Sequence, residues 1–297
     1  MRTYLDCIPC FLRQALDAAR LVSPDPALHE RLLRDVLRWT AGMELSQPPP
    51  VMGQRIHRQL RALTGQEDPY RAAKQEQNRM ALALLAELRD RIAAAADSLE
   101  MAVRLAVAGN VIDMGANGAV AEADVRAALE RALAEPLIGD MDGFRRRAGR
   151  ARSILYLADN AGEIVFDRVL VEALRPARVT VAVRGAPVLN DATREDARVA
   201  GLSEIAEIID NGSDAPGTLL ADCSEAFRRE FAAADMLVAK GQGNYETLNQ
   251  GPREVFFLFK AKCPVIAERA NVPLGAHLVV RHLPTDRGEA GVLGPRP

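Results

Sequence analysis

The sequence has little histidine and little cysteine, with four residues of each among 297. The histidines are scattered along the chain, and no H-E-x-x-H pattern occurs. Serine never occurs in the G-x-S-x-G pattern of a nucleophile elbow. Histidine-zinc hydrolysis and serine-triad chemistry are therefore disfavoured. Four cysteines in a chain of this length also make no disulfide framework.

Long apolar runs are missing as well. No segment approaches the roughly 20 apolar residues that cross a bilayer, and the first residues lack the apolar core of a secretion signal. The 38 basic and 40 acidic residues leave a formal charge of −2, so no overall positive field attracts nucleic acid or anionic lipid. We expect a cytoplasmic protein with neither nucleic acid nor membrane as a partner, whose phosphate contacts, if any, are local.

Lysine is the rarest basic residue of this arginine-rich chain. Only four lysines occur, and Lys240, Lys260 and Lys262 fall close together. An ammonium is a compact point charge, whereas a guanidinium is a wide planar fork. The C-terminal lysines are therefore candidates for sites where only the smaller cation fits.

The first half of the chain is predicted to be helical. Apolar residues recur every three or four positions, with arginine and glutamate between them, from Arg13 onward and over residues 27–43, 70–96 and 122–134. Asp68 followed by Pro69 is typical of a helix start, and Pro48, Pro49 and Pro50 separate two helices. We expect residues 1–150 to be a helical bundle domain.

After residue 150 the periodicity changes. Short apolar runs alternate with segments of helical pattern; the runs are residues 154–158, 179–183, 204–209, 236–239 and 264–267. This alternation is typical of a parallel sheet covered on both faces. We predict an α/β fold in which residues 151–280 are a doubly wound core domain and residues 281–297 are a tail.

Polar residues stand where the predicted strands end. Asp159 and Asn160 follow the first strand, Asp191 lies in the segment after the second, and Lys240 and Gly241 end the fourth. In a doubly wound sheet, ligands bind in the crevice beyond the carboxyl ends of the strands. A single loop of this composition is ordinary turn chemistry, but several at one edge predict a ligand site.

The residue types at these ends indicate a metal and a phosphate. Carboxylate and amide oxygens are hard ligands that suit Mg²⁺ or Mn²⁺, and Asp159, Asn160 and Asp191 would leave positions for water and substrate. Glycines at 241 and 243 let backbone amides approach an anion, to which Lys240 and Lys262 would offer ammonium groups. The pattern favours a phosphate ester beside a divalent cation.

Six motifs, taken in order, resemble the damage-control phosphatases, a family first described as a domain of unknown function. They are Cys7-Ile8-Pro9-Cys10, Gly109-Asn110-Val111-Ile112-Asp113, Asp159-Asn160-Ala161-Gly162-Glu163, Leu189-Asn190-Asp191-Ala192-Thr193, Lys240-Gly241-Gln242-Gly243-Asn244-Tyr245-Glu246 and Lys260-Ala261-Lys262-Cys263. The first of them is typical of the prokaryotic branch. The resemblance covers the chain up to about Val280.

The resemblance implies a metal-dependent phosphatase of small phosphorylated metabolites, such as sugar phosphates and damaged cofactor precursors, with Mg²⁺, Mn²⁺, Co²⁺ or Ni²⁺ as the ion. It implies metal ligation by Asp159, Asn160 and Asp191, and phosphate contact by Lys262. Further candidates for substrate contact, from both halves of the chain, are Asn110, Asp113, Glu163, Arg184, Lys240, Gly241, Gly243, Asn244 and Glu246.

Several alternatives stay open at this point. Water or Asp159 itself is the attacking group, although Asp159-Asn160 lacks the Asp-x-Asp spacing of the best-known aspartyl-phosphate enzymes. A relative of the family has been described as a carboxyl methyltransferase that uses S-adenosylmethionine, but the Gly241 segment lacks the third glycine of a dinucleotide fingerprint. A non-catalytic sensor of a phosphorylated metabolite is the third alternative, and the oligomeric state is unknown.

The Cys7-x-x-Cys10 motif supplies only half of a tetrahedral zinc site. Redox pairs of this spacing usually follow a strand, and no strand is predicted before Cys7. We favour a structural or unassigned role over a metal or redox role. Trp39 and the phenylalanines at 256, 257 and 259 are predicted to be core residues.

Overall fold

A computed structural model describes residues 1–110 and 122–284 of the chain. In this part the strands are one sheet in the order β1-β7-β6-β5-β2-β3-β4. The strands are β1 (Leu137–Gly139), β2 (Ser153–Leu157), β3 (Arg178–Val183), β4 (Glu207–Asp210), β5 (Met236–Lys240), β6 (Val255–Lys260) and β7 (His277–His282). Every neighbouring pair is parallel except β6 and β7.

Helices precede the sheet and connect its strands. They are α1 (Cys7–Val22), α2 (Pro26–Ala41), α3 (Pro49–Thr64), α4 (Arg71–Ala94), α5 (Ser98–Ala108), α6 (Glu122–Ala134), α7 (Met141–Ala148), α8 (Glu163–Ala173), α9 (Arg194–Val199), α10 (Glu225–Ala233), α11 (Gly241–Leu248) and α12 (Pro264–Ala270). None of the helices in the described ranges is long and apolar enough to cross a membrane.

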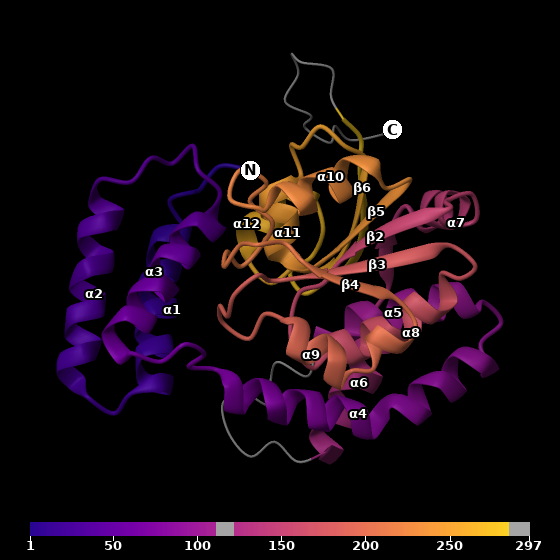
Figure 1. The fold of residues 1–297 in the computed structure, drawn as a ribbon, viewed down its shortest axis with the longest axis horizontal. Coiled ribbons are helices and arrows are strands. Elements are labelled where there is room, and N and C mark those ends of the chain that lie inside the picture. The colour runs from indigo at the N-terminus through magenta and orange to yellow at the C-terminus, as the bar shows by residue number, and fades with distance from the viewer. Residues whose placement is uncertain (111–121, 285–297) are drawn as a thin grey trace.

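The central strands are buried on both faces because successive side chains point into two different cores. On β2, Tyr156 packs into a core with helices α4, α5, α6, α8 and α9, whereas Leu157 packs into a second core with α10, α11 and α12. Figure 1 shows the two groups of helices on opposite faces of the sheet. The predicted doubly wound α/β core is confirmed.

The helices of the first half contribute to two different cores. Phe11, Leu32 and Ile56, from α1, α2 and α3, belong to a separate apolar cluster, and these three helices stand together beside the sheet (Figure 1). In contrast, Leu84 of α4 and Val103 of α5 belong to the core on the sheet. The division into domains of residues 1–150 and 151–280 stays a prediction, but α4 and α5 pack with the sheet.

Two predicted strands differ in the structure. Residues 264–267 are not a strand, because they lie in α12, whose first residue is Pro264. Proline at this position fixes a helical φ and lacks only a hydrogen that the helix start leaves unpaired anyway. The neighbouring strand is instead β6, whose phenylalanines alternate between the two cores. The predicted strand of residues 204–209 begins later, at Glu207, because Leu202–Glu204 is a 3₁₀ turn.

The chain order of the strands creates a topological switch point in the sheet. From β2 the chain builds β3 and β4 on one side, and it then crosses to build β5 and β6 on the other. The connections after β2 and β5 therefore leave in opposite directions, which is the topological switch point where such sheets bind ligands. Asp159 follows β2, and Gly241 follows β5.

Candidate active site

Asn160 and Asp191 are joined by an isolated antiparallel β-bridge beyond the ends of β2 and β3. The Ala192 amide donates to the Asp159 carbonyl at 2.8 Å, and the Ala161 amide donates to the Asn190 carbonyl at 2.8 Å. These bonds hold the two loops side by side. The structure therefore brings together the segments of the predicted metal ligands Asp159, Asn160 and Asp191. Asn160 and Asp191 are 31 residues apart in the sequence.

Gly241, which follows β5, lets the end of that strand lie close to Asp159. Its φ is +79°, and a Cβ atom there would lie 1.9 Å from Oδ2 of Asp159. Only glycine adopts this conformation at low cost, and only glycine leaves room for the carboxylate. The predicted role of Gly241 in anion contact stays a prediction, while its observed role is to admit Asp159.

Arg184 is a buried cation between the carboxylates. Its Nε donates to Oδ2 of Asp191 at 2.6 Å, and its Nη2 lies 3.7 Å from Oδ1 of Asp159. The residue is only 3% exposed, and Nη2 has no hydrogen-bond partner in the described part of the chain. Buried donors without a partner are rare in folded proteins.

Burial is the largest influence on the pKa of the two aspartates at this edge. Burial raises the pKa of Asp159 well above its usual value, the charges of Glu163 and Asp191 raise it further, and Lys262 and Arg184 offset only part of the effect. Burial also raises the pKa of Asp191, against the opposing effect of Arg184. A cation bound nearby would favour the ionised form of both buried carboxyl groups.

Glu163, at the start of α8, faces Asn160 rather than open solvent. Its Oε2 accepts from Nδ2 of Asn160 at 3.1 Å and from Nδ2 of Asn110 at 3.4 Å. Burial would raise the pKa of Glu163, but the charge and hydrogen bond of Lys240 outweigh it, and the pKa is lowered. Asn110 therefore contacts Glu163, and its predicted contact with substrate stays a prediction. Asp113 lies outside the described residues.

Lys240 does not face the crevice. Its side chain is 0% exposed, and Nζ donates to Oε1 of Glu163 at 2.6 Å, to Oδ1 of Asp167 at 2.6 Å and to the Ala106 carbonyl at 2.8 Å. The two carboxylates raise the pKa of Lys240 although burial opposes the charge. All three ammonium protons have acceptors inside the protein, and the predicted contact of Lys240 with substrate stays a prediction.

Three further candidates on α11 have protein partners. A Cβ atom at Gly243 would lie 2.3 Å from the Pro216 carbonyl, so this glycine admits a neighbouring loop. Asn244 is buried and donates to the Lys240 carbonyl at 2.8 Å, which ties the start of α11 together. Glu246 accepts from Gln242 at 2.8 Å, and burial raises its pKa to about 7. Their predicted contacts with substrate stay predictions.

Lys262 lies exposed on the loop between β6 and α12. Its backbone amide donates to Oε1 of Gln242 at 3.0 Å. Its positive charge lowers the pKa of Asp159, Glu163 and Asp191, although burial dominates the net shift at both aspartates. Lys262 is thus an exposed cation whose charge acts on two of the predicted metal ligands.

The donor atoms at this edge are oxygens. In the described ranges, no group of three or more histidine, cysteine, aspartate or glutamate side chains is arranged to hold a metal ion. The predicted set has two carboxylates, and its third member is the amide of Asn160. This chemistry suits magnesium or manganese, which complete their coordination with water and substrate, and does not suit zinc.

Cys7 and Cys10 stand in the first turn of α1, and both are free thiols. Burial raises the pKa of each, and the neighbouring charges of Glu246 and Cys263 raise it further. A thiol with a raised pKa is a poor nucleophile and a poor metal ligand at neutral pH. The structural or unassigned role that the sequence favours stays a prediction.

Several polar residues of α4 and α8 that no sequence motif marks lie at or near the site. Asn78 of α4 accepts from the Gly162 amide at 2.7 Å, and Gln77 accepts from Asn190 at 3.4 Å, so α4 borders the site. Asp167 lies within α8 and contacts Lys240. An aspartate inside the apolar segment Ile164-Val165-Phe166-Asp167 was the available signal, because such a residue is seldom buried unless it is paired.

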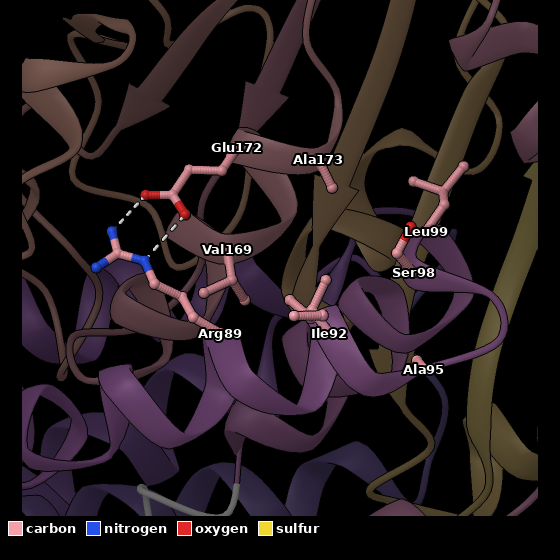
Figure 2. A pocket seen from close by; sticks show the side chains of 9 residues that line it. Arg89, Ile92, Ala95, Ser98, Leu99, Val169, Glu172 and Ala173 are labelled. Carbon is pink, nitrogen blue, oxygen red and sulfur yellow. Dashed lines mark hydrogen bonds and ion pairs between the residues drawn. The ribbon is translucent and has the colours of Figure 1, made fainter.

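A hollow of about 520 Å³ lies elsewhere, between α4, α5 and α8 (Figure 2). Its lining residues are Arg89, Ile92, Ala93, Ala95, Ser98, Leu99, Val169, Glu172 and Ala173. The pair of Arg89 and Glu172, 2.6 Å apart, closes one side. None of the predicted site residues lines this hollow, so it is separate from the crevice at Asp159.

The fold and the site together define a doubly wound α/β protein with an acidic, oxygen-rich site at its switch point. Comparisons with known proteins agree. The chain is 32% identical to a damage-control phosphatase of Pyrococcus horikoshii and 34% identical to one of Archaeoglobus fulgidus. These matches cover 95% and 91% of the chain, and 99% and 95% of the relatives. An uncharacterized protein of Methanocaldococcus jannaschii is 36% identical over 93% of the chain and 94% of its own length.

A crystal structure of a protein of the DUF89 family from Pyrococcus horikoshii has the same fold, with a TM-score of 0.87 at 32% identity. The match covers 95% of the chain and all of that structure. The sequence profile of the damage-control phosphatase ARMT1-like domain matches residues 3–278. The chain belongs to this damage-control phosphatase family, which confirms the resemblance in the six motifs. The family does not favour the methyltransferase or sensor alternatives.

Proposed function

We propose that the chain is a metal-dependent phosphomonoester hydrolase of small phosphorylated metabolites, either sugar phosphates or damaged phosphometabolites. The observation that carries this proposal is the bridge between Asn160 and Asp191, which holds the two segments with the three proposed ligands side by side in a phosphatase-family chain. A crevice of this kind suits a small ligand.

The residues at the site fit a hard divalent cation. Asp159 and Asp191 are buried carboxylates whose pKa values are raised by burial, so a nearby divalent ion would compensate their charge. Asn160 adds a neutral oxygen. We propose Mn²⁺ or Mg²⁺ as the ion, with Co²⁺ or Ni²⁺ as substitutes. When bound, the ion supplies Lewis-acid stabilisation of charge on the phosphoryl group and activates water.

Arg184 and Lys262 are the proposed phosphate contacts of the protein itself. The unpaired Nη2 of Arg184 is a buried donor that a phosphoryl oxygen would satisfy. Lys262 carries an exposed positive charge at the rim, where it would draw in an anion and stabilise charge on the transferred group. Both cations reduce the repulsion between the site carboxylates and a phosphate.

We propose that water, rather than Asp159, is the nucleophile. Oδ2 of Asp159 accepts from Nδ2 of Asn160 at 3.1 Å and lies where a side chain at position 241 would be. We therefore assign the Asp159 carboxylate to ion ligation and not to attack on phosphorus. The proposed partner is a small anionic metabolite of the cytoplasm, since the net charge of −2 gives no general attraction for nucleic acid or lipid.

The proposal is tested by measuring phosphate release from a panel of sugar phosphates, with Mn²⁺, Mg²⁺, Co²⁺, Ni²⁺ or a chelator present. We expect turnover that requires the metal and that falls at least 100-fold in Asp159→Ala, because removal of a charged ligand disrupts transition-state stabilisation. Asp17→Ala is the matched control, since Asp17 is exposed on α1. Equal melting temperatures would show that both variants fold.

Other outcomes separate the rival functions. Turnover retained in Asp159→Ala, or turnover unaffected by the chelator, would contradict the metal assignment. A phosphorylated metabolite that raises the melting temperature without being hydrolysed would indicate a sensor. A response to S-adenosylmethionine alone would indicate a methyltransferase.

A further inference from the structure

A buried ion cluster lies directly beneath the proposed metal site. Lys240 ends β5 and is enclosed by Glu163, Asp167 and the C-terminal turn of α5. Glu163 and Asp167 are four residues apart on α8, so they lie on one face of that helix, one turn apart. The ammonium of Lys240 bridges them at 2.6 Å each.

Tyr156 completes the cluster from β2. Its hydroxyl donates to Oδ1 of Asp167 at 2.8 Å, the same oxygen that accepts from Lys240. Tyr156, Asp167 and Lys240 are all 0% exposed, and Glu163 is 3% exposed. Lys240, its three acceptors and Tyr156 thus link four elements, β2, β5, α5 and α8. A lysine buried to this degree is held in one position by its partners.

The two carboxylate oxygens of Glu163 accept hydrogen bonds from different residues. Oε1 accepts from Lys240, whereas Oε2 accepts from Nδ2 of Asn160 at 3.1 Å. Nδ2 of Asn160 also donates to Oδ2 of Asp159 at 3.1 Å. The atom of the Asn160 amide that faces both carboxyl groups is thus its nitrogen, the donor of the amide.

The opposite side of the amide is therefore its oxygen. In the described part of the chain, no donor reaches Oδ1 of Asn160, in contrast to the two acceptors on Nδ2. A metal ligand whose other atom is hydrogen-bonded to a fixed partner keeps one orientation, and loss of that partner typically lowers metal affinity 10- to 100-fold.

We propose that Asp167 and Lys240 are positioning residues that, through Glu163, hold the Asn160 amide with its oxygen turned toward the metal. This inference rests on the proposed function and adds to it a role for Asp167, which touches neither the metal ligands nor the crevice. Tyr156 supports Asp167 in the same role. In this proposal Lys240 holds Glu163 and Asp167 together and is not a phosphate ligand.

The direct test is the affinity for Mn²⁺, measured on the full chain by the loss of the free-ion electron paramagnetic resonance signal. We expect Asp167→Asn to raise the dissociation constant at least tenfold, because the pull of Asp167 on Lys240 is lost and Glu163 shifts. In turnover assays the Mn²⁺ concentration for half-maximal rate should rise by a similar factor. The KM for substrate at saturating Mn²⁺ should change less.

Glu172→Gln is the matched control, because Glu172 is a carboxylate of the same helix that pairs with Arg89 and Arg168 instead. It removes one negative charge from α8 and should leave Mn²⁺ affinity unchanged within twofold. Tyr156→Phe removes one hydrogen bond to Asp167 without changing any charge, and it should weaken Mn²⁺ binding by a smaller factor, about threefold. This second variant keeps the test valid if Asp167→Asn does not fold.

The outcomes distinguish a failure of the positioning role from a failure of the proposed function. A wild-type chain that binds Mn²⁺, together with folded Asp167 and Tyr156 variants that bind it equally well, would overturn the positioning role alone. An equal loss of affinity in Glu172→Gln would also overturn it, since the effect would then be one of general charge. A wild-type chain that binds no Mn²⁺ would overturn the proposed function and the positioning role with it.

Discussion

A Cβ atom at Gly241 would lie 1.9 Å from Oδ2 of Asp159, so the two residues fit together only because position 241 has no side chain. The end of β5 and the end of β2 meet at this contact. It makes the backbone of α11 part of the wall that holds the proposed metal ligand.

Gly241→Ala should therefore displace Asp159. We expect metal-dependent phosphate release to fall about 100-fold, because a shift of about 1 Å at a catalytic group has effects of that size. Gly42→Ala is the control, since a Cβ atom there would meet nothing within 4 Å. Normal activity in a folded Gly241→Ala variant would contradict the assigned position of Asp159.

Arg184 should stabilise the fold far more than an exposed arginine does. In Arg184→Gln, Asp191 loses a buried partner at 2.6 Å, and the free energy of unfolding should fall by about 3 kcal/mol in a chelator. Arg194→Gln removes a pair with Asp210 whose arginine side chain is 56% exposed, and this change should stay within about 0.5 kcal/mol. Urea unfolding measures both.

Equal losses in the two arginine variants would show that Asp191 is not dependent on Arg184. The same experiment with Mn²⁺ present provides a further check. Added metal should recover part of the stability that Arg184→Gln loses, because the ion would supply a positive charge beside Asp191.

Glu246 should make the chain less stable as the pH rises. Its pKa is raised from 4.5 to about 7 by burial, so between these values the folded chain keeps a proton that the unfolded chain has lost. Stability linked to this group is present below pH 4.5 and is lost as the pH rises through 7. Glu246→Gln should remove this loss, on the order of 3 kcal/mol at full effect.

The measurement is urea unfolding of the wild type and of Glu246→Gln at pH 5 and pH 8. Relative to the wild type, the variant should gain stability at pH 8 compared with pH 5. Glu225→Gln is the control, since the Glu225 side chain is 77% exposed. Curves that stay parallel for the wild type and Glu246→Gln would show that burial does not shift the Glu246 carboxyl.

The convergence of Asp159, Asn160 and Asp191 could be predicted from the sequence because the segments that carry them come after apolar runs. Runs of that kind become parallel strands, and parallel strands end at one edge. The sequence did not show that α4 also borders this edge through Asn78. Helix periodicity indicates which face of a helix is apolar, but not which core receives that face.

The position of Lys240 could not be predicted for a related reason. A lysine at a strand end points to the crevice or to the core according to the strand register, and the sequence does not fix this register. Its partner Asp167 was overlooked because one carboxylate in an apolar helix has no pattern of its own. The predicted strand of residues 264–267 is part of helix α12 for a similar reason. A short apolar run suits either a strand or a helix, and here Pro264 starts a helix.

The most direct test of the account is a crystal structure of the chain grown with Mn²⁺, with the ion located by its anomalous scattering. We predict one strong peak within about 2.0–2.6 Å of oxygens from Asp159, Asn160 and Asp191. A peak elsewhere, or side chains of these three residues that bind no ion at saturating Mn²⁺, would contradict it.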